Sequence, residues 1–372
     1  MDYILSSANG KEQRHFLNSS IAFKARIPGR MEKTLNTSLP FFRLSLTLLL
    51  FQVPALAQET VQEQVKSSPA FQVEFVSQYP TVESKHQNKK LADKLNQILF
   101  GKIKKDLGRP VSMIVSKTNQ YWILDQKNKS IFHVNTKKSE IPHYIEKNKF
   151  NLNSLVSICN FKNEQILFSD SYLNTIFLID PENKKCSVLN DSLKLEKPTG
   201  IIFSAANNEI WVTETGKHRI VILNEKGEIK RTIGKRGIGK GEFNFPTHIW
   251  MDSKGLVYVV DAMNFRVQIF DEEGIVQSVF GTNGDATGNF ASPKGIATDS
   301  YGNIYVADAL FNAVQIFDFN GNFLYTFGSQ GQDAGQFWMP SGIYIDDKDF
   351  VYVSDTYNSR VQIFHVTTDA RK

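Results

Sequence analysis

Apolar and polar positions alternate in short runs over most of this chain, and the runs recur at a fixed spacing. Between residues 293 and 328 the runs are GIATD, NIYVAD, NAVQIFD and FLYTFG, rich in Val, Ile, Tyr and Phe. Alternation over this length is typical of half-buried strands. Asn320-Gly321, between the last two runs, suits a two-residue hairpin because both residues tolerate positive φ. The pattern predicts four short antiparallel strands in each copy.

The repeat is clearest in three copies near the C-terminus, where the marker residues Asp261, Asp308 and Asp355 are 47 residues apart. Weaker copies precede them, marked by Asp125, Asp170 and Glu214. A unit of this size cannot bury its apolar face alone, so neighbouring units must stack. The sequence therefore predicts an all-β fold, a six-bladed β-propeller of four-stranded antiparallel blades. A repeated β-sandwich or an open solenoid is the alternative.

The two ends of the repeat region predict how the ring closes. The sixth unit stops after its third strand, at RVQIFHV, and an alternating run, Phe71 to Val76, precedes the first unit. We expect this N-terminal strand to complete the last blade, because closure removes exposed strand edges. The predicted propeller spans residues 71–366, and residues 367–372 form a tail.

The segments Val260 to Phe270 and Ser354 to Phe364 fit the pattern VADxxNxRVQIF, which follows P-x-G-I in the clearest copies. This pattern resembles the NHL repeat, strongly over residues 198–366 and weakly over 110–197. The resemblance implies a six-bladed NHL-type propeller. Members of this family mostly bind proteins, peptides or RNA, and a few resemble lyases with a metal on the axis. The fold alone therefore does not choose a function.

The front of the chain carries a different signal. In residues 31–57, Lys33 and Arg43 precede an apolar run, and Ala55-Leu56-Ala57 supplies small residues before Gln58. This predicts a secretory signal peptide, with an uncleaved anchor as the alternative. The run is too short to span the ~30 Å of hydrocarbon as a helix, so we expect no transmembrane segment after cleavage. The predicted location is the periplasm, the cell envelope or the outside of the cell.

Two further N-terminal stretches follow from that assignment. Residues 1–30 are polar and displace the signal from the terminus, so we interpret them as a non-native or disordered upstream extension, with translation starting at Met31. Residues 58–70 are a predicted linker. Residues 80–109 stand outside the repeats and place apolar side chains at helical spacing among lysines. They predict a helical, basic insertion on the rim, or else a contact with a partner or an acidic membrane surface.

Charge changes the picture once the signal is removed. The chain has a formal net charge of +5, but residues 1–57 contain seven basic and three acidic residues, so the mature chain is near neutral. This argues against nucleic acid as the partner. Residues 58–240 contain 29 basic and 19 acidic residues, and residues 241–372 contain 7 and 16. Blades one to three are thus positive and blades four to six negative. Either this charge difference arose by drift between the copies, or it steers a charged partner across the disc.

Residues that differ between copies are better site candidates than shared ones. At the start of the innermost strand the six copies have Ser112, Ser157, Gly200, His248, Gly295 and Gly342. Two residues later, blades four and six carry Trp250 and Tyr344. We therefore predict His248, Trp250 and Tyr344 as ligand or partner contacts near the mouth of the axial channel. In the alternative, the aromatic rings pack between blades and His248 bonds to a backbone carbonyl.

The repeated carboxylate has a structural interpretation, because a short acidic side chain at a strand end accepts backbone N–H groups of a turn. Arg219, Arg266 and Arg360 follow it by five residues, where they either pair with it or contact a partner. No motif for a zinc site, a nucleophile or a phosphate loop is present. We assign no catalytic residue and expect no metal and no cofactor. Cys159 and Cys186 fall on the first and fourth strands of blade two, about 14 Å apart, too far for a disulfide.

These observations favour an exported, non-enzymatic NHL-type module that binds a protein or peptide, and we expect it to be a monomer. The alternative is a propeller lyase or hydrolase with a metal or small ligand in the channel. The third hypothesis is an RNA-binding NHL domain, against which the near-neutral mature chain and the export signal argue.

Overall fold

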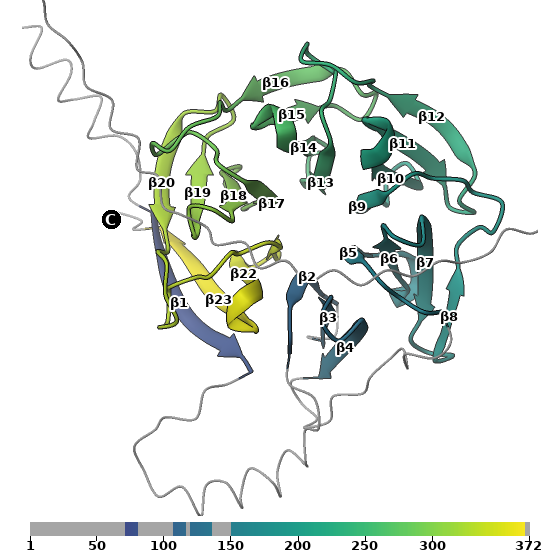
Figure 1. The fold of residues 1–372 in the computed structure, drawn as a ribbon, viewed down its shortest axis with the longest axis horizontal. Helices are drawn as coiled ribbons and strands as arrows, with labels where there is room; N and C mark the ends of the chain where they lie inside the picture. Colours follow the sequence, from purple (N-terminus) through teal and green to yellow (C-terminus); the bar gives the residue numbers. More distant parts are fainter. Residues whose placement is uncertain (1–70, 81–106, 117–119, 136–149, 369–372) are drawn as a thin grey trace, which may run out of the picture. The chain divides into compact units, whose positions relative to one another are not determined.

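The computed structural model describes residues 71–80, 107–116, 120–135 and 150–368, all within one unit, Ser67–Lys372. Six antiparallel sheets stand around a central axis (Figure 1). Among the described residues five sheets have four strands and the first has three; residues 136–149, which follow its third strand, lie outside the described part. The predicted six-bladed, all-β propeller is confirmed. The predictions for residues 1–70, and those for the insertion between residues 81 and 106, fall on residues outside the description.

In blades one to five the strand next to the axis comes first and the others follow outward in chain order, whereas in blade six the outermost strand is β1. The strands of blades one to three are β2 (Pro110–Val115), β3 (Gln120–Asp125), β4 (Ser130–Asn135), β5 (Leu155–Asn160), β6 (Ile166–Asp170), β7 (Thr175–Asp180), β8 (Lys185–Val188), β9 (Pro198–Ser204), β10 (Glu209–Glu214), β11 (Arg219–Asn224) and β12 (Ile229–Ile233). The strands of blades four to six are β13 (Pro246–Met251), β14 (Val257–Asp261), β15 (Arg266–Phe270), β16 (Val276–Phe280), β17 (Pro293–Thr298), β18 (Ile304–Asp308), β19 (Ala313–Phe317), β20 (Phe323–Phe327), β21 (Ile343–Ile345), β22 (Phe350–Asp355), β23 (Arg360–Thr368) and β1 (Phe71–Tyr79). One-turn 3-10 helices in the loops are η1 (Lys162–Glu164), η2 (Thr215–Lys217), η3 (Ala262–Asn264) and η4 (Thr356–Asn358).

The ring closes through its first strand. Strand β1 pairs antiparallel with β23, and Phe75 stands opposite Phe364 with the two ring centroids 5.7 Å apart. The sheet order β1-β23-β22-β21 places an N-terminal strand outside three C-terminal ones, as predicted. Closure supplies β23 with a partner along its outer edge, an edge that would otherwise be open to pairing with other chains.

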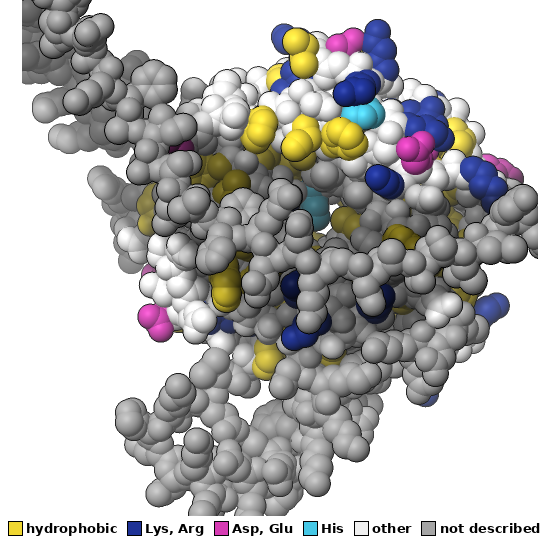
Figure 2. All heavy atoms as spheres, viewed as in Figure 1, with side chains coloured by type: hydrophobic (Ala, Val, Ile, Leu, Met, Phe, Trp, Pro, Cys, Tyr) yellow, Lys and Arg dark blue, Asp and Glu magenta, His cyan; other side chains and the backbone are white. Residues whose placement is uncertain are grey.

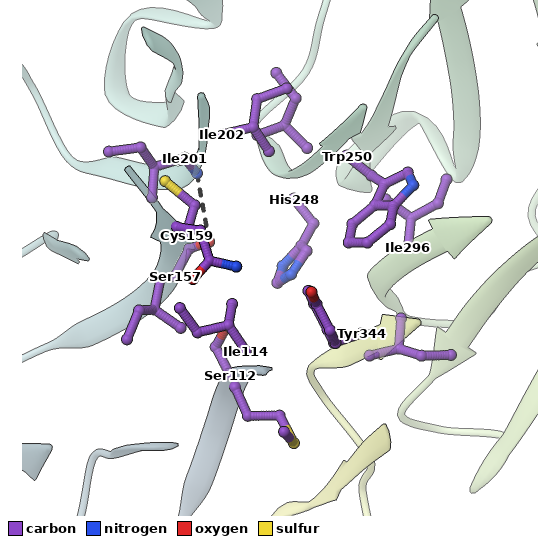
Figure 3. Close-up of a pocket in the computed structure, with 15 residues that line it drawn as sticks. Ser112, Ile114, Ser157, Cys159, Ile201, Ile202, His248, Trp250, Ile296 and Tyr344 are labelled. Atoms are coloured by element: carbon purple, nitrogen blue, oxygen red, sulfur yellow. Dashed lines mark hydrogen bonds between the residues drawn. The ribbon is translucent and has the colours of Figure 1, made fainter. Parts of the chain in front are cut away.

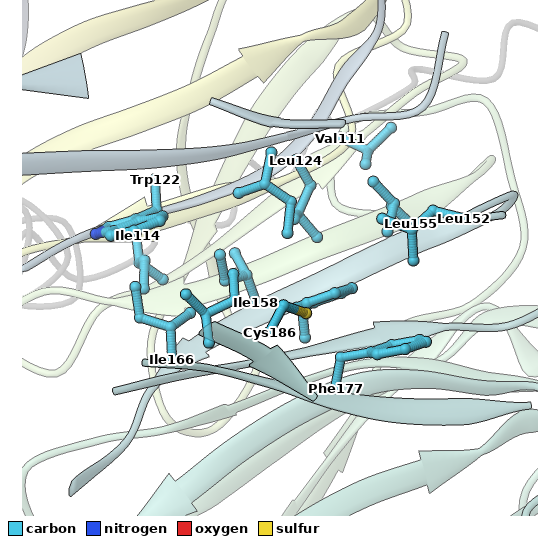
Figure 4. Packing of buried hydrophobic residues seen from close by; sticks show 13 residues of the cluster. Val111, Ile114, Trp122, Leu124, Leu152, Leu155, Ile158, Ile166, Phe177 and Cys186 are labelled. Carbon is cyan, nitrogen blue, oxygen red and sulfur yellow. The ribbon is translucent and has the colours of Figure 1, made fainter. Parts of the chain in front are cut away.

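The core consists of six hydrophobic clusters, each shared by two neighbouring blades. One cluster joins Leu124 of blade one to Phe168 and Phe177 of blade two (Figure 4). Another joins Phe132 of blade one to Ile363 of blade six, so the first and last blades pack like any other pair. Period-two alternation places one set of side chains on each face of a sheet, and both faces are covered. This explains why second strands such as β14 (VYVVD) and β18 (IYVAD) are buried along their whole length.

The described residues contain no helix long and apolar enough to cross a membrane. The two cysteines lie on β5 and β8, the inner and outer strands of blade two, as predicted. Both are buried, Cys159 against blade three and Cys186 against blade one. Burial raises the pKa of the Cys159 thiol far above its usual range. This thiol is therefore inert at neutral pH.

Candidate functional site

The innermost strands of all six blades line one narrow channel on the axis. Its walls include Ser112, Ser157, Ile201, His248, Ile296 and Tyr344. In Figure 3 the side chains of His248, Trp250 and Tyr344 point toward the same space. The structure thus places these three predicted residues around one cavity. The cavity measures only about 70 Å³, whereas ligand pockets usually measure about 300–1,000 Å³. The channel has room for a few water molecules rather than for a substrate.

His248 is half-buried in the channel wall. Burial lowers its pKa to about 4, and the nearby positive charge of Lys294 acts in the same direction. The imidazole is therefore neutral at physiological pH. Across the part of the chain that the structure describes, no group of three or more His, Cys, Asp and Glu side chains is placed to hold a metal ion.

Trp250 and Tyr344 pack edge to face, with ring centroids 5.6 Å apart and planes at 78°. The Trp250 indole N–H donates to Thr298 Oγ1 at 2.9 Å, and the Tyr344 hydroxyl lies 3.5 Å from the Val115 carbonyl oxygen. Burial, helped by the charges of nearby carboxylates, raises the pKa of Tyr344 to about 12. Both rings also border the hydrophobic clusters between blades. They fill the channel and join blades, while their predicted role in ligand contact stays a prediction.

Three other blades have glycine at the position of His248, and packing explains the glycines in blades five and six. A Cβ added to Gly342 would lie 2.4 Å from the Val111 carbonyl oxygen of the next blade, and one added to Gly295 would lie 2.4 Å from that of Ser341. Both distances are shorter than any real contact, so glycine is required where neighbouring inner strands approach most closely. Sequence comparison of the copies could not separate this cause from a functional one.

The repeated carboxylates are all fully buried at the ends of the second strands. Asp261 accepts the Asn244 N–H at 2.6 Å, and Asp355 accepts the Trp338 N–H at 2.7 Å. Each bond ties the connector that enters a blade to the turn inside that blade. This is the structural role that the sequence indicated.

The three arginines complete the same framework. Their Nε atoms donate to the repeated carboxylate at 2.6 Å for Arg219, 2.8 Å for Arg266 and 2.7 Å for Arg360. Arg266 also donates to the carbonyl oxygens of Ile238, Gly239 and Glu242, and so clamps the connector between blades three and four. Their predicted partner contacts stay a prediction, because what the structure shows is a role in holding loops.

A surface feature that the sequence reasoning missed lies around the channel, on the end of the propeller where the connectors arrive. The residue two positions after the repeated carboxylate is a large apolar side chain in four blades, and its exposed fraction is 68% for Tyr172, 50% for Met263, 60% for Leu310 and 44% for Tyr357. Ile238, Phe245 and Trp338 of the connectors are also exposed. We call these seven residues the apolar face. Figure 2 views this end and shows hydrophobic side chains beside basic ones.

The apolar face is held in a fixed geometry. The Tyr172 N–H donates to Asp170 Oδ1 at 3.0 Å, and the Tyr357 N–H donates to the Trp338 carbonyl oxygen at 3.1 Å. The Trp338 and Tyr357 ring centroids are 5.6 Å apart, and the Arg109 guanidinium lies 5.1 Å from the Tyr357 centroid. The sequence contains a large apolar residue inside four of the six polar turns, but it does not show that these side chains are exposed.

Comparisons with known proteins agree with the geometry. Residues 151–278 match a protein family described as a 6-bladed beta-propeller, and residues 337–364 match the NHL repeat. A search among curated proteins gives no match.

Several solved structures share the fold. Virginiamycin B lyase from Staphylococcus aureus is 15% identical, with a TM-score of 0.52 over 80% of this chain and 99% of that one. An auxiliary nutrient binding protein from Bacteroides ovatus is 13% identical, with a TM-score of 0.58 over 81% and 78%. A gluconolactonase from Xanthomonas campestris is 11% identical, with a TM-score of 0.55 over 70% and 87%. Enzymes and binding proteins stand together here, so this likeness shows the fold alone. With the sequence matches and the six blades in agreement, this chain is a six-bladed β-propeller, and its residues 337–364 match the NHL repeat.

Proposed function

We propose that this protein is a non-enzymatic binding module that holds a polypeptide partner on the apolar face. The observation that carries the proposal is the repeated exposure of a large apolar side chain at one turn position in four blades. The turn does not require such a residue, because blades one and three have Lys127 and Gly216 at the same position. Apolar groups gathered on one surface without a structural cause are typical of an interaction site.

The composition and rigidity of the face favour a polypeptide. Tyr, Trp and Met are enriched at the centres of protein interfaces and supply much of their binding energy. The turns are anchored to buried carboxylates, so little ordering cost remains when a partner binds. The channel is too small for a substrate, which directs the contact to the rim of the channel and the surrounding turns.

The proposal includes that the module is a monomer and that it is exported. Export is inferred from residues 31–57 and therefore rests on the sequence alone. An exported module of this kind would meet its partner in the cell envelope or outside the cell. The lyase or hydrolase hypothesis requires an ion or a small ligand bound on the axis, and metal analysis of the purified protein tests it directly.

The experiment compares the wild type with the variant M263S/L310S/Y357S. A partner is first purified from the cell envelope by affinity to the processed chain, and its affinity for each form is then measured by calorimetry. Truncating an interface anchor costs about 1–2 kcal/mol, so we expect the triple variant to bind roughly 100-fold more weakly or worse. The control is Ile275→Ser, because Ile275 is exposed in the loop before β16 at the opposite end of the blades. Equal affinity of both variants would refute the proposal.

A further inference from the structure

The connector between blades three and four, residues 234–245, has two counterparts with the same backbone, 281–292 and 328–339. In the first, the Phe243 N–H donates to the Lys235 carbonyl oxygen at 2.8 Å. The matching bonds from Phe290 to Thr282 and from Phe337 to Ser329 are also 2.8 Å. Phe243, Phe290 and Phe337 are all fully buried. The three connectors therefore share one backbone structure although their sequences differ.

Their outward side chains differ. Only the first connector carries Lys235, Arg236 and Lys240, and all three are exposed. The corresponding residues are Thr282, Asn283 and Thr287 in the second connector, and Ser329, Gln330 and Ala334 in the third. Since those sequences form the same loop, the loop does not need the positive charges.

Ile238 is the second difference. Its side chain is 81% exposed, and Asp285 and Gln332 occupy the corresponding positions. An isoleucine this exposed contributes nothing to the core. It stands between Arg236 and Lys240 on the same connector and is itself part of the apolar face. Basic side chains thus adjoin the face to which we assign partner binding.

Intramolecular partners account for only part of this charge. Lys235 forms an ion pair with Glu242 at 3.3 Å, but its side chain is 78% exposed, so the pair is weak. The Glu242 carboxylate is also occupied by the Gly239 N–H at 3.0 Å. Burial lowers the pKa of His218, and the positive charge of Arg236 adds to this effect, which places Arg236 beside turn η2. The nearby carboxylates of Asp261 and Glu196 act on His218 in the opposite direction. Among the described residues Arg236 and Lys240 form no ion pair, so their charges are available to an anionic ligand.

We propose that this connector binds an acidic polypeptide segment, whose carboxylates pair with Arg236 and Lys240 while an apolar side chain packs on Ile238. The inference rests on the proposed function and names the chemistry of the partner. Complementary charge accelerates association and excludes wrong partners. The apolar side chain that stands between the basic residues is aliphatic Ile238, whereas single-stranded nucleic acid is usually held by aromatic stacking directly among the basic groups. The geometry therefore favours a peptide over RNA.

The test uses a random dodecapeptide library selected on the folded wild-type protein. Selected peptides are measured against the exchange variant K235T/R236N/I238D/K240T, which carries the blade-five residues that already form this loop. Lys226→Ser, in an exposed loop at the opposite end of the blades, is the matched control. We expect the selected peptides to be rich in Asp and Glu with one or two Leu, Ile or Phe. They should bind the exchange variant at least tenfold more weakly, bind the control unchanged and weaken as salt rises.

Other outcomes overturn the inference. These are selection of neutral or basic peptides, no enrichment at all, or equal affinity for the exchange variant. Tighter binding of a single-stranded RNA homopolymer or of phosphatidylglycerol vesicles through the same residues also overturns it. Should the exchange variant not fold, Arg236→Asn and Lys240→Thr are tested singly. Binding lost in M263S/L310S/Y357S but kept in the exchange variant overturns this inference and leaves the proposed function standing. The reverse result supports the connector and counts against Met263, Leu310 and Tyr357 as partner contacts.

Discussion

Arg360 stabilises both the last blade and the closure of the ring, and its removal is a sharp test of the framework described above. Its Nε donates to Asp355 at 2.7 Å, and its Nη atoms donate to the carbonyl oxygens of Gln332, Asp333 and Gln336 and to Gln78 Oε1 of β1. Only 8% of the side chain is exposed, and Asp355 is fully buried. Arg360→Ala therefore leaves a buried carboxylate without its cation.

The size of the effect follows from that burial. Removing one member of a buried ion pair costs about 3–5 kcal/mol, because the remaining charge keeps its desolvation penalty. We expect the free energy of unfolding to fall by about 3–4 kcal/mol. Arg266→Ala is the matched comparison and should cost less, about 2–3 kcal/mol. Arg266 is more exposed, at 12%, and the bond to β1 belongs to Arg360.

Blade five suggests how the loss can be compensated. There Ala313 replaces the arginine and Phe311 replaces the asparagine that corresponds to Asn358. The double variant N358F/R360A copies this arrangement and should recover about 1–2 kcal/mol, because an apolar side chain then covers the carboxylate while the backbone N–H groups still bind it. Urea unfolding followed by tryptophan fluorescence measures all three variants. A loss below about 1 kcal/mol for Arg360→Ala, the value of an exposed ion pair, would refute the reasoning.

Three further predictions test other parts of the structure. Because His248 is neutral in the folded protein with a pKa of about 4, its contribution to stability is complete above about pH 6.5 and is lost as pH falls toward 4. We therefore expect His248→Gln to lose about 1–2 kcal/mol less stability than the wild type between pH 7.5 and pH 4.5, measured by unfolding at both pH values. An unchanged pH dependence contradicts this prediction. Gly342→Ala should cost about 1–3 kcal/mol of stability, because the added methyl group clashes with Val111. Gly302→Ala should cost less, ~1 kcal/mol, because Gly302 has φ +88 but open space around it. The reverse order in thermal unfolding argues against the packing explanation. Removing residues 1–80 should expose the outer edge of β23 and lower the midpoint temperature of thermal unfolding. A synthetic peptide of residues 71–80 should restore this midpoint. A midpoint that the deletion leaves unchanged counts against closure through β1.

The sequence predicted the fold well because the propeller repeats one local pattern. Strand alternation, turn residues and the marker carboxylate recur in register, so each weak copy is supported by its neighbours. Even the closing strand followed from counting strands in the sixth unit. The buried role of Asp261 and its equivalents followed from turn chemistry, because a carboxylate at a strand end has nearby N–H groups to accept.

The candidate site was predicted less completely. His248, Trp250 and Tyr344 were placed together, but the diameter of the channel depends on how closely the inner strands approach, which no spacing in the sequence reports. Arg266 reaches carbonyl groups 24 to 28 residues earlier in the chain, which only the folded connector brings near. The exposure of Leu310 and Tyr357 could not be predicted either, because apolar residues in a strand-rich sequence are expected to be buried.

Pairing of β1 with β23 also sets an order of events during synthesis. Gln78 and Arg360, which bond across the closure, are 282 residues apart. At about 5–20 residues per second, the ribosome needs roughly 15–60 s to make the strand that β1 awaits. Strand β1 must wait for its partner over that interval, and the ring of the nascent chain therefore stays open until its last blade has emerged.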